Sequence, residues 1–363
     1  MTIPGDRSVT CDNGSMTYPL RYKQDVAFLL GHPAFGAMTK ARLATLLPEM
    51  IAAGLTTDPN LMHTAVRFDD ETMADYVRRR VGEDFQENYV EPLFRGPWHW
   101  EPEEISRAYL LSILGHLSRH DLATFRQGIG ALTRKLAAGL DVRTDTAVSR
   151  VEESEGRVTV ALADGRSMTA DIVVLAVQGN KVAGLIGGTA ALRHDHVKDV
   201  RYTPWARVYY SLKRAPANPR NLRFTRRNPS AISFYDEFAH DRIVPEGHVQ
   251  PPYLQAELTP QTRDRMIAEG GTANPDRYAR DAVRALYPDL ERDLDAIVEQ
   301  YWDEMLPQWH PGYARKVADF LARQEKVRRR VYACGDYLAH SHTGGACASG
   351  RRTARLVLGH WSG

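Results

Sequence analysis

The residues best suited to chemistry in this chain lie near its end, where an apolar stretch leads into an acidic turn. The stretch from Val331 to Cys334 predicts a short buried strand, and Gly335 and Asp336 follow it as a turn. A carboxylate at the carboxyl end of a strand can accept hydrogen bonds from sugar-alcohol hydroxyls. Gly335 and Asp336 are therefore candidate residues for binding an extended cofactor.

A second group of candidates opens the helix that follows this turn. Gly344, Gly345 and Ala346 are small, so their backbone amides can come close to a ligand. The first amides of a helix are donors at the positive end of its dipole and favour a negative charge. A ring system that becomes negatively charged on reduction is one such ligand. The alternative interpretation is an ordinary strand, turn and helix at the end of an α/β domain.

Several aromatic and imidazole side chains are candidates for contact with a substrate. His340 and His342 lie in the loop before that helix, and His99 lies between two tryptophans. Tyr235 on a predicted strand and Trp302 before a proline loop complete the set. Each of them has a structural alternative as part of a loop or a core. The sequence contains no Ser-His-Asp order or paired carboxylate motif, so no catalytic residue is assigned.

Length and charge set the broad class. The chain has 363 residues, above the single-core limit of about 250 to 300, so two domains or one elaborate domain are expected. Lys plus Arg number 47 and Asp plus Glu 45, and a net charge of +2 gives no sign of nucleic-acid binding. No window reaches the roughly 18 apolar residues of a spanning helix, so we expect no integral membrane segment and at most peripheral membrane contact.

The three cysteines are Cys11, Cys334 and Cys347, which are far apart in the chain. Their spacing is unlike that of a metal site, so no metal is expected. Few and scattered cysteines are typical of a reducing compartment, and the first thirty residues do not resemble a secretion signal. We therefore expect a cytoplasmic location.

The elements that position these candidates begin with a helical region. Residues 1–24 are polar and predict a frayed start or an edge hairpin. Apolar residues recur at helical spacing from Asp25 to Leu55, where Gly54 predicts a helix end. Prolines cut the next block into short helices, and an apolar stripe resumes from Ile105 to Leu117. Residues 25–120 are thus predicted to be all-helical.

Strands dominate the middle of the chain. Residues 121–190 predict a helix and then a β-meander that starts near Val148. The continuous apolar run from Ile172 to Val177 predicts a strand buried on both faces. Residues 191–300 predict a sheet followed by helices, the last of them from Leu290 to Ile297.

The order of these features resembles the flavin amine oxidase and protoporphyrinogen oxidase superfamily. The Gly335-Asp336 turn and the Gly345-Ala346 pair resemble its carboxyl-terminal FAD-binding motif. The strand at Val148 resembles the one whose backbone pairs with the adenine. The segment QYWDEMLPQWHPGYARKV, which contains Trp302, resembles the step before the final motif in the protoporphyrinogen oxidase group. The resemblance covers roughly residues 25–358.

This resemblance implies an α/β (α+β) fold. A Rossmann-like FAD domain would be built from residues 121–190 and 301–363, beside a mixed-sheet substrate domain in 191–300 and a helical insertion in 25–120 that roofs the substrate cavity. FAD is the implied cofactor. The residues implied to hold it are Val148, Gly335, Asp336, Gly344, Gly345 and Ala346, and those expected near the substrate are His99, Tyr235, Trp302 and His342.

One part of the family pattern is absent from the sequence. Dinucleotide-binding domains open with a Gly-x-Gly-x-x-Gly turn, and none occurs in this chain. The FAD-binding domain is therefore expected to be incomplete, and the FAD pyrophosphate would lack its main charge compensation. Three explanations are open. Met1 is an internal methionine of a longer protein, a separate FAD-binding polypeptide supplies the turn, or the chain has abandoned FAD chemistry.

The expected function is that of an FAD-dependent oxidoreductase of the oxidase or desaturase type. It would remove hydride from a C–N or C–C bond of a small, largely apolar substrate, with the cofactor carrying the difficult step. Tetrapyrroles, polyenes and amines are all candidates, and the Leu-Pro-Gln-Trp step favours a protoporphyrinogen oxidase-like enzyme. The alternatives are a cofactor-free binding or scaffold derivative of the fold and one half of a split flavoenzyme.

Overall fold

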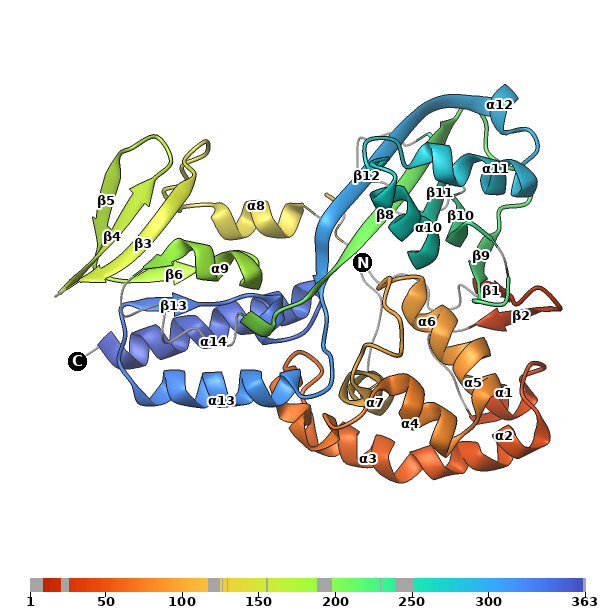
Figure 1. Ribbon diagram of the computed structural model, residues 1–363, viewed down its shortest axis with the longest axis horizontal. Coiled ribbons are helices and arrows are strands. Elements are labelled where there is room, and N and C mark those ends of the chain that lie inside the picture. The colour runs from red at the N-terminus through yellow and green to blue at the C-terminus, as the bar shows by residue number, and fades with distance from the viewer. Residues whose placement is uncertain are drawn as a thin grey trace.

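The computed structural model describes residues 9–20, 26–116, 125, 127, 128, 130–154, 156–187, 198–228, 230–238 and 251–361. These residues form three sheets with helices around them, so the predicted mixed α/β fold is confirmed. Figure 1 shows that two long strands, β8 (Tyr202–Leu212) and β12 (Leu294–Pro307), run from one half of the molecule into the other.

The largest sheet has seven strands in the order β12, β8, β11, β10, β9, β1 and β2. Its remaining strands are β1 (Val9–Asp12), β2 (Thr17–Leu20), β9 (Asn221–Phe224), β10 (Ile232–Phe238) and β11 (Tyr253–Leu258). Helices α10 (Pro260–Ala268), α11 (Asp276–Leu286) and α12 (Leu290–Asp293) lie beside it (Figure 1). Ala206, Val208 and Tyr210 of β8 share a core with α11. Because side chains alternate along a strand, Trp205 and Arg207 face the other side.

The helix predicted from Leu290 to Ile297 is wrong in its second half. Helix α12 ends at Asp293, and β12 starts at Leu294 and pairs with β8. Ile297 packs against the sheet core. Pairing with a long neighbouring strand outweighs the local tendency of these few residues to continue a helix.

The part of the chain predicted to be helical contains seven α-helices in its described residues. They are α1 (Val26–Gly31), α2 (Ala37–Arg42), α3 (Leu47–Thr56), α4 (Met73–Arg80), α5 (Glu83–Phe85), α6 (Glu91–Arg95) and α7 (Arg107–His116), with 3-10 turns at Leu43–Leu46 and Met62–Phe68 and a π turn at Gln86–Val90. Gly54 does not end a helix as predicted but lies inside α3. A Cβ there would approach the carbonyl oxygen of Gly115 to 2.6 Å, so the glycine permits close contact between α3 and α7.

The other half of the molecule contains the two smaller sheets (Figure 1). One has the order β5 (Ser167–Ala170), β4 (Arg157–Leu162), β3 (Val148–Ser154) and β7 (Ile186–Gly187), and the other pairs β13 (Val331–Ala333) with β6 (Val173–Leu175). Its helices are α8 (Ala131–Ala137), α9 (Gly179–Leu185), α13 (Tyr313–Lys326) and α14 (Thr343–Trp361). The prediction that the strand near Val174 is buried on both faces is wrong, because Val174 is 44% exposed while Leu175 enters the core. β6 is held along one edge by β13.

Two hydrophobic cores hold the described residues together. One lies between the large sheet and α11. The other is continuous from the helical region, through Phe68 and Tyr109, to Leu175 and Val331 of the parallel strand pair. This second core fixes the helical region against the half that carries the acidic turn. Within the described part of the chain, no helix combines the length and the apolar character needed to cross a membrane.

Candidate cofactor and substrate site

The acidic turn lies at the carboxyl edge of the parallel strand pair. Strands β13 and β6 run in the same direction, so the residues that follow them meet at one edge. Asp336 follows β13, and Gly179 follows β6 and opens α9. A Cβ on Gly179 would lie 2.7 Å from the ring of Tyr337. The glycine therefore lets the two connections pack together, which places Asp336 above the edge where open α/β sheets bind ligands.

The carboxylate of Asp336 is placed to accept hydrogen bonds. One oxygen accepts from the backbone amide of Tyr337 at 2.9 Å. Burial raises the pKa of this carboxyl above its ordinary value, although the side chain is only partly covered. The neighbouring Gly335 amide donates to Oγ of Ser349 in α14 at 3.0 Å, which ties the turn to the last helix. Asp336 thus retains acceptor capacity toward solvent or a ligand.

The start of α14 differs from the expectation of bare amides. The Gly345 amide donates to Nδ1 of His342 at 3.1 Å, and the Ala346 amide donates to the carbonyl oxygen of His342 at 3.1 Å. A Cβ on Gly345 would lie 2.2 Å from the carbonyl oxygen of His340. The close approach of the loop therefore explains this glycine, and the amides of Gly345 and Ala346 have partners inside the protein.

Two further cofactor candidates, Val148 and Gly344, have backbone groups that a ligand could reach. Val148 is the first residue of β3 and pairs with Leu162 of β4 on one side. On the other side, β3 meets β7 only from Val151 onward in the described structure. Val148 is also partly exposed, so its edge can pair with a planar heterocycle. Gly344 lies beside Asn60, and a Cβ there would come within 2.6 Å of Oδ1 of that side chain.

A series of packed rings leads from the α14 loop into the helical region. The ring centroids of His342 and His340 lie 4.2 Å apart, those of His340 and Tyr109 4.3 Å, and those of Tyr109 and Trp100 4.7 Å. The hydroxyl of Tyr109 lies 3.2 Å from Nδ1 of His340. We call these four rings the ring column. It connects the acidic-turn loop to the residues next to His99.

His99 lies at the meeting point of the helical region and the large sheet. Its φ of 52° is in the left-handed region, and its side chain is fully buried. Nε2 lies 2.9 Å from Oε2 of Glu257, and because an ionised carboxylate only accepts, Nε2 carries the proton. The His99 ring lies 4.7 Å from the ring of Trp205, which in turn lies 6.2 Å from Trp302. The structure therefore forms two ring series, one from His342 to Trp100 and one from His99 to Trp302, which adjoin where His99 precedes Trp100 in the chain.

A buried charge cluster supports His99. Glu257 on β11 receives His99 on one oxygen and Nη2 of Arg207 on the other, at 2.5 Å. Burial would raise the pKa of Glu257, but the hydrogen bond from His99 and the charge of Arg207 outweigh it and lower the pKa. Burial lowers the pKa of His99 despite the carboxylate. We call His99, Glu257, Arg207 and Trp205 the His99 cluster.

Sequence reasoning missed Arg207, Glu257 and Tyr109. A usable signal existed for the first two, because each charged residue alternates with apolar ones in the middle of a strand. That pattern was not recognised as a sign of a buried site, and His99 from the helical region contacts Glu257 and Trp205 there. Tyr109 lies within an apolar helix and its sequence context has no feature that separates it from ordinary core residues.

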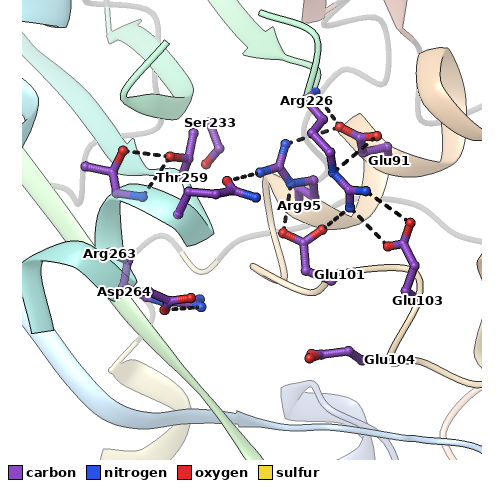
Figure 2. Close-up of polar contacts among 12 residues, drawn as sticks. Glu91, Arg95, Glu101, Glu103, Glu104, Arg226, Ser233, Thr259, Arg263 and Asp264 are labelled. Carbon is purple, nitrogen blue, oxygen red and sulfur yellow. Dashed lines mark hydrogen bonds and ion pairs between the residues drawn. The ribbon is translucent and has the colours of Figure 1, made fainter. Parts of the chain in front are cut away.

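An ion-pair network fixes the loop that carries His99. Figure 2 shows Arg95 and Arg226 among Glu91, Glu101 and Glu103. Arg95 also donates to Oε1 of Gln261 on α10, at 2.6 Å. Partial burial would raise the pKa of Glu103, but hydrogen bonds from Arg226 and Arg78 outweigh it and lower the pKa to about 2. The loop after α6 is thus tied to α10 before His99 and to the turn that follows β9 after His99.

Tyr235 lies apart from the other substrate candidates. Its side chain is buried in the core between the sheet and α11, and its hydroxyl donates to Oε1 of Glu237 at 2.7 Å. It stands on the face of the sheet opposite to Glu257, since Ala256 is its partner in register. A role for Tyr235 in substrate binding stays an untested prediction. Among the described residues, no group of His, Cys, Asp and Glu could hold a metal ion.

The fold defines the class of protein. Residues of this chain align with a double mutant of putrescine oxidase at a TM-score of 0.70 and 15% identity, covering 97% of this chain and 81% of that one. A provisionally named protoporphyrinogen oxidase from Exiguobacterium sp. 255-15 aligns at a TM-score of 0.64 and 16% identity, covering 100% and 81%. The architecture is therefore that of the flavin amine oxidases.

The sequence places the chain within a family. The model of the flavin containing amine oxidoreductases matches residues 8–358, and the chain belongs to that family. It is also 20% identical over 302 residues to coproporphyrinogen III oxidase of Bacillus subtilis (strain 168), an alignment that covers 74% of this chain. The chain spans 63% of the length of that relative.

Proposed function

We propose that this protein is an FAD-dependent oxidoreductase that removes hydride from a C–N or C–C bond of a small, largely apolar substrate. The observation that carries the proposal is the placement of Asp336 at the carboxyl edge of the parallel strand pair, with the ring column leading from its loop to Trp100, next to His99. Family membership supports a flavin as the cofactor.

The donor and acceptor set supports FAD in part. Asp336 can accept hydrogen bonds from the ribityl hydroxyls, and the edge of β3 at Val148 can pair with the adenine. At α14, the amides of Gly345 and Ala346 are used by His342, which leaves Gly344 as the candidate amide there. Bound FAD would supply a hydride acceptor. The chain's own residues would orient the substrate and exclude water from it.

The substrate side is built from rings. Trp98 and Trp302 are partly exposed, so they offer flat apolar surfaces suited to a conjugated or cyclic substrate, and the buried rings of Trp100 and Tyr109 pack against Trp98. His99 is held in one orientation by Glu257, so it can position a polar substrate atom. His342 would contribute less directly, because its ring nitrogen already caps α14. Reduced tetrapyrroles fit this surface best, in agreement with the name of the Bacillus subtilis relative.

Two finer aspects of the proposal concern partners and location. A separate polypeptide or a further segment would supply amides for the FAD pyrophosphate, and the exposed apolar side chains of Val148, Val174 and Val177 support a partner surface there. The three cysteines are all free, which supports a reducing, cytoplasmic setting.

A cofactor-free binding protein is the alternative function, favoured by the internal use of the Gly345 and Ala346 amides.

The substrate proposal is tested by anaerobic reduction of the FAD-loaded protein. Coproporphyrinogen III should bleach the flavin absorbance, because each hydride that leaves the substrate reduces one flavin. Formation of the fluorescent porphyrin removes three hydrides, so without oxygen it should appear at no more than one porphyrin for every three flavins reduced. Putrescine serves as the matched amine. Bleaching by putrescine but not by coproporphyrinogen III would contradict the tetrapyrrole assignment and indicate an amine oxidase.

A further inference from the structure

The outer surface of α2, the following 3-10 turn and α3 is unusually apolar. The exposed residues between 37 and 56 are Ala37, Met38, Ala41, Arg42, Ala44, Thr45, Leu47, Pro48, Ile51, Leu55 and Thr56, and Arg42 is the one that carries a charge. Met38, Ile51 and Leu55 are 64%, 60% and 76% exposed. In Figure 1 these helices lie along one outer edge of the molecule. We call this surface the α2–α3 face.

Helix α3 is apolar on both sides. Leu47, Ile51 and Leu55 are spaced four residues apart and form one exposed stripe. On the opposite side, Ala53 is fully buried and Gly54 contacts α7. A helix of this kind is normally covered on all sides by protein or lies against a membrane.

Another exposed helix of the same chain shows the ordinary pattern. The exposed residues of α13 are Arg315, Lys316, Asp319, Ala322, Arg323, Glu325 and Lys326, and each except Ala322 carries a charge. The α2–α3 face is thus a local property of these helices and not a feature of the composition of the chain.

The charges next to this face are mainly basic, and the acidic neighbour Asp84 is bonded to the amide of Gly36 and the hydroxyl of Thr39. Lys40 and Arg42 lie on α2, and Nη2 of Arg80 donates to the carbonyl oxygen of Thr45 at 2.9 Å. The one acidic residue between 37 and 56 is Glu49, whose carboxylate is bonded to Arg107 and Tyr76 and lies away from the stripe. The α2–α3 face therefore combines apolar area with positive charge.

We propose that the α2–α3 face lies against the surface of a lipid bilayer that contains anionic lipids. Apolar side chains would enter the boundary between headgroups and acyl chains, while Lys40 and Arg42 would meet lipid phosphates. A second copy of this chain fits less well. A two-fold contact would bring the same basic residues together, without a free carboxylate from residues 37–56 to pair with them.

Vesicle co-sedimentation of the full chain tests this inference and needs no cofactor. Wild type should sediment with phosphatidylcholine vesicles that contain phosphatidylglycerol, and more weakly at high salt or without the anionic lipid. Combined Ile51→Glu and Leu55→Glu changes should lower vesicle affinity by about tenfold or more, because two exposed apolar side chains are lost from the contact. Leu358→Glu is the matched control, since Leu358 is 62% exposed on α14.

Three outcomes would overturn the proposal. Wild type could stay in the supernatant with anionic vesicles, or the double variant could sediment as well as wild type. Alternatively, wild type could form a dimer that the double variant lacks, without binding vesicles, which would assign the face to a second copy. Unchanged thermal melting of both variants shows that they are folded, as expected for substitutions at exposed positions.

Discussion

Replacing Gly345 by alanine should lower the free energy of unfolding by about 3 kcal/mol, because the new Cβ has no room. It would lie 2.2 Å from the carbonyl oxygen and 2.7 Å from the backbone nitrogen of His340. Both obstacles are backbone atoms, so a side-chain rotation cannot relieve them. The loop must shift away from α14, and the hydrogen bond from Gly345 to His342 is lost with it. Urea unfolding measures the difference.

Gly350→Ala on the same helix is the matched control. A Cβ at Gly350 meets nothing within 4 Å. Alanine is the better helix former, so this change should raise stability by about 0.5 to 1 kcal/mol. Equal effects of the two substitutions would contradict the close approach of the loop to the start of α14.

Glu257→Gln should lower the free energy of unfolding by about 3 kcal/mol, because it leaves Arg207 as a buried charge without its carboxylate. Both oxygens of Glu257 are occupied, one by His99 and one by Arg207. An amide offers one acceptor and turns its NH₂ group toward a donor. Under the proposed function the variant should also misplace His99 and weaken substrate binding.

The control for this change is Glu291→Gln. Glu291 pairs with Arg280 and Arg284, but its side chain is 51% exposed against 3% for Glu257. Exposed pairs contribute about 0 to 1 kcal/mol, so a small effect is expected. A loss at Glu257 as small as the loss at Glu291 would contradict the role of the His99 cluster as a buried support.

The pH dependence of stability should also report on the His99 cluster. Burial holds the pKa of His99 below its ordinary value of 6.5. The unfolded chain therefore takes up a proton below that pH that the folded chain does not, and stability falls as the pH drops below it. Glu257 acts in the same direction, because its lowered pKa makes the unfolded state the better proton acceptor.

The sequence predicted the parts of the fold that depend on local periodicity and order. The strand at Val331, the strand near Val148 and the helices between residues 25 and 120 occur where they were expected. Period-2 and helical spacings are set by the residues themselves, so they can be recognised without knowledge of neighbours. The family placement followed from the order of such elements and was confirmed by the match over residues 8–358.

The errors arose where distant residues decide the outcome. Gly54 has the sequence signature of a helix end, yet its function is contact with Gly115. The residues after Asp293 were predicted to continue a helix, but they form strand β12 and pair with β8. Val174 was predicted to be buried, but its side chain is exposed and the neighbouring Leu175 is buried in the core. Each case depends on a partner far away in the chain, which no local pattern contains.

The same limit applied within the candidate site. Asp336 was identified because an acidic turn after a strand has a local signature. The partners of His99 came from β8 and β11, more than a hundred residues later in the chain. The prediction that His342 approaches a substrate stays untested, and its ring contacts His340, the start of α14 and the carbonyl oxygen of Pro59. Tertiary contacts therefore define how the site is supported.

The central claim is that this chain binds FAD through Asp336, and an FAD titration followed by visible absorbance tests it most directly. Wild type should bind FAD with a shifted flavin spectrum, and Asp336→Ala should bind about tenfold or more weakly, because charge-assisted bonds to the ribityl hydroxyls are lost. Asp319→Ala, on the exposed side of α13, should bind like wild type. Absence of FAD binding by wild type, or equal binding by Asp336→Ala, would contradict the claim.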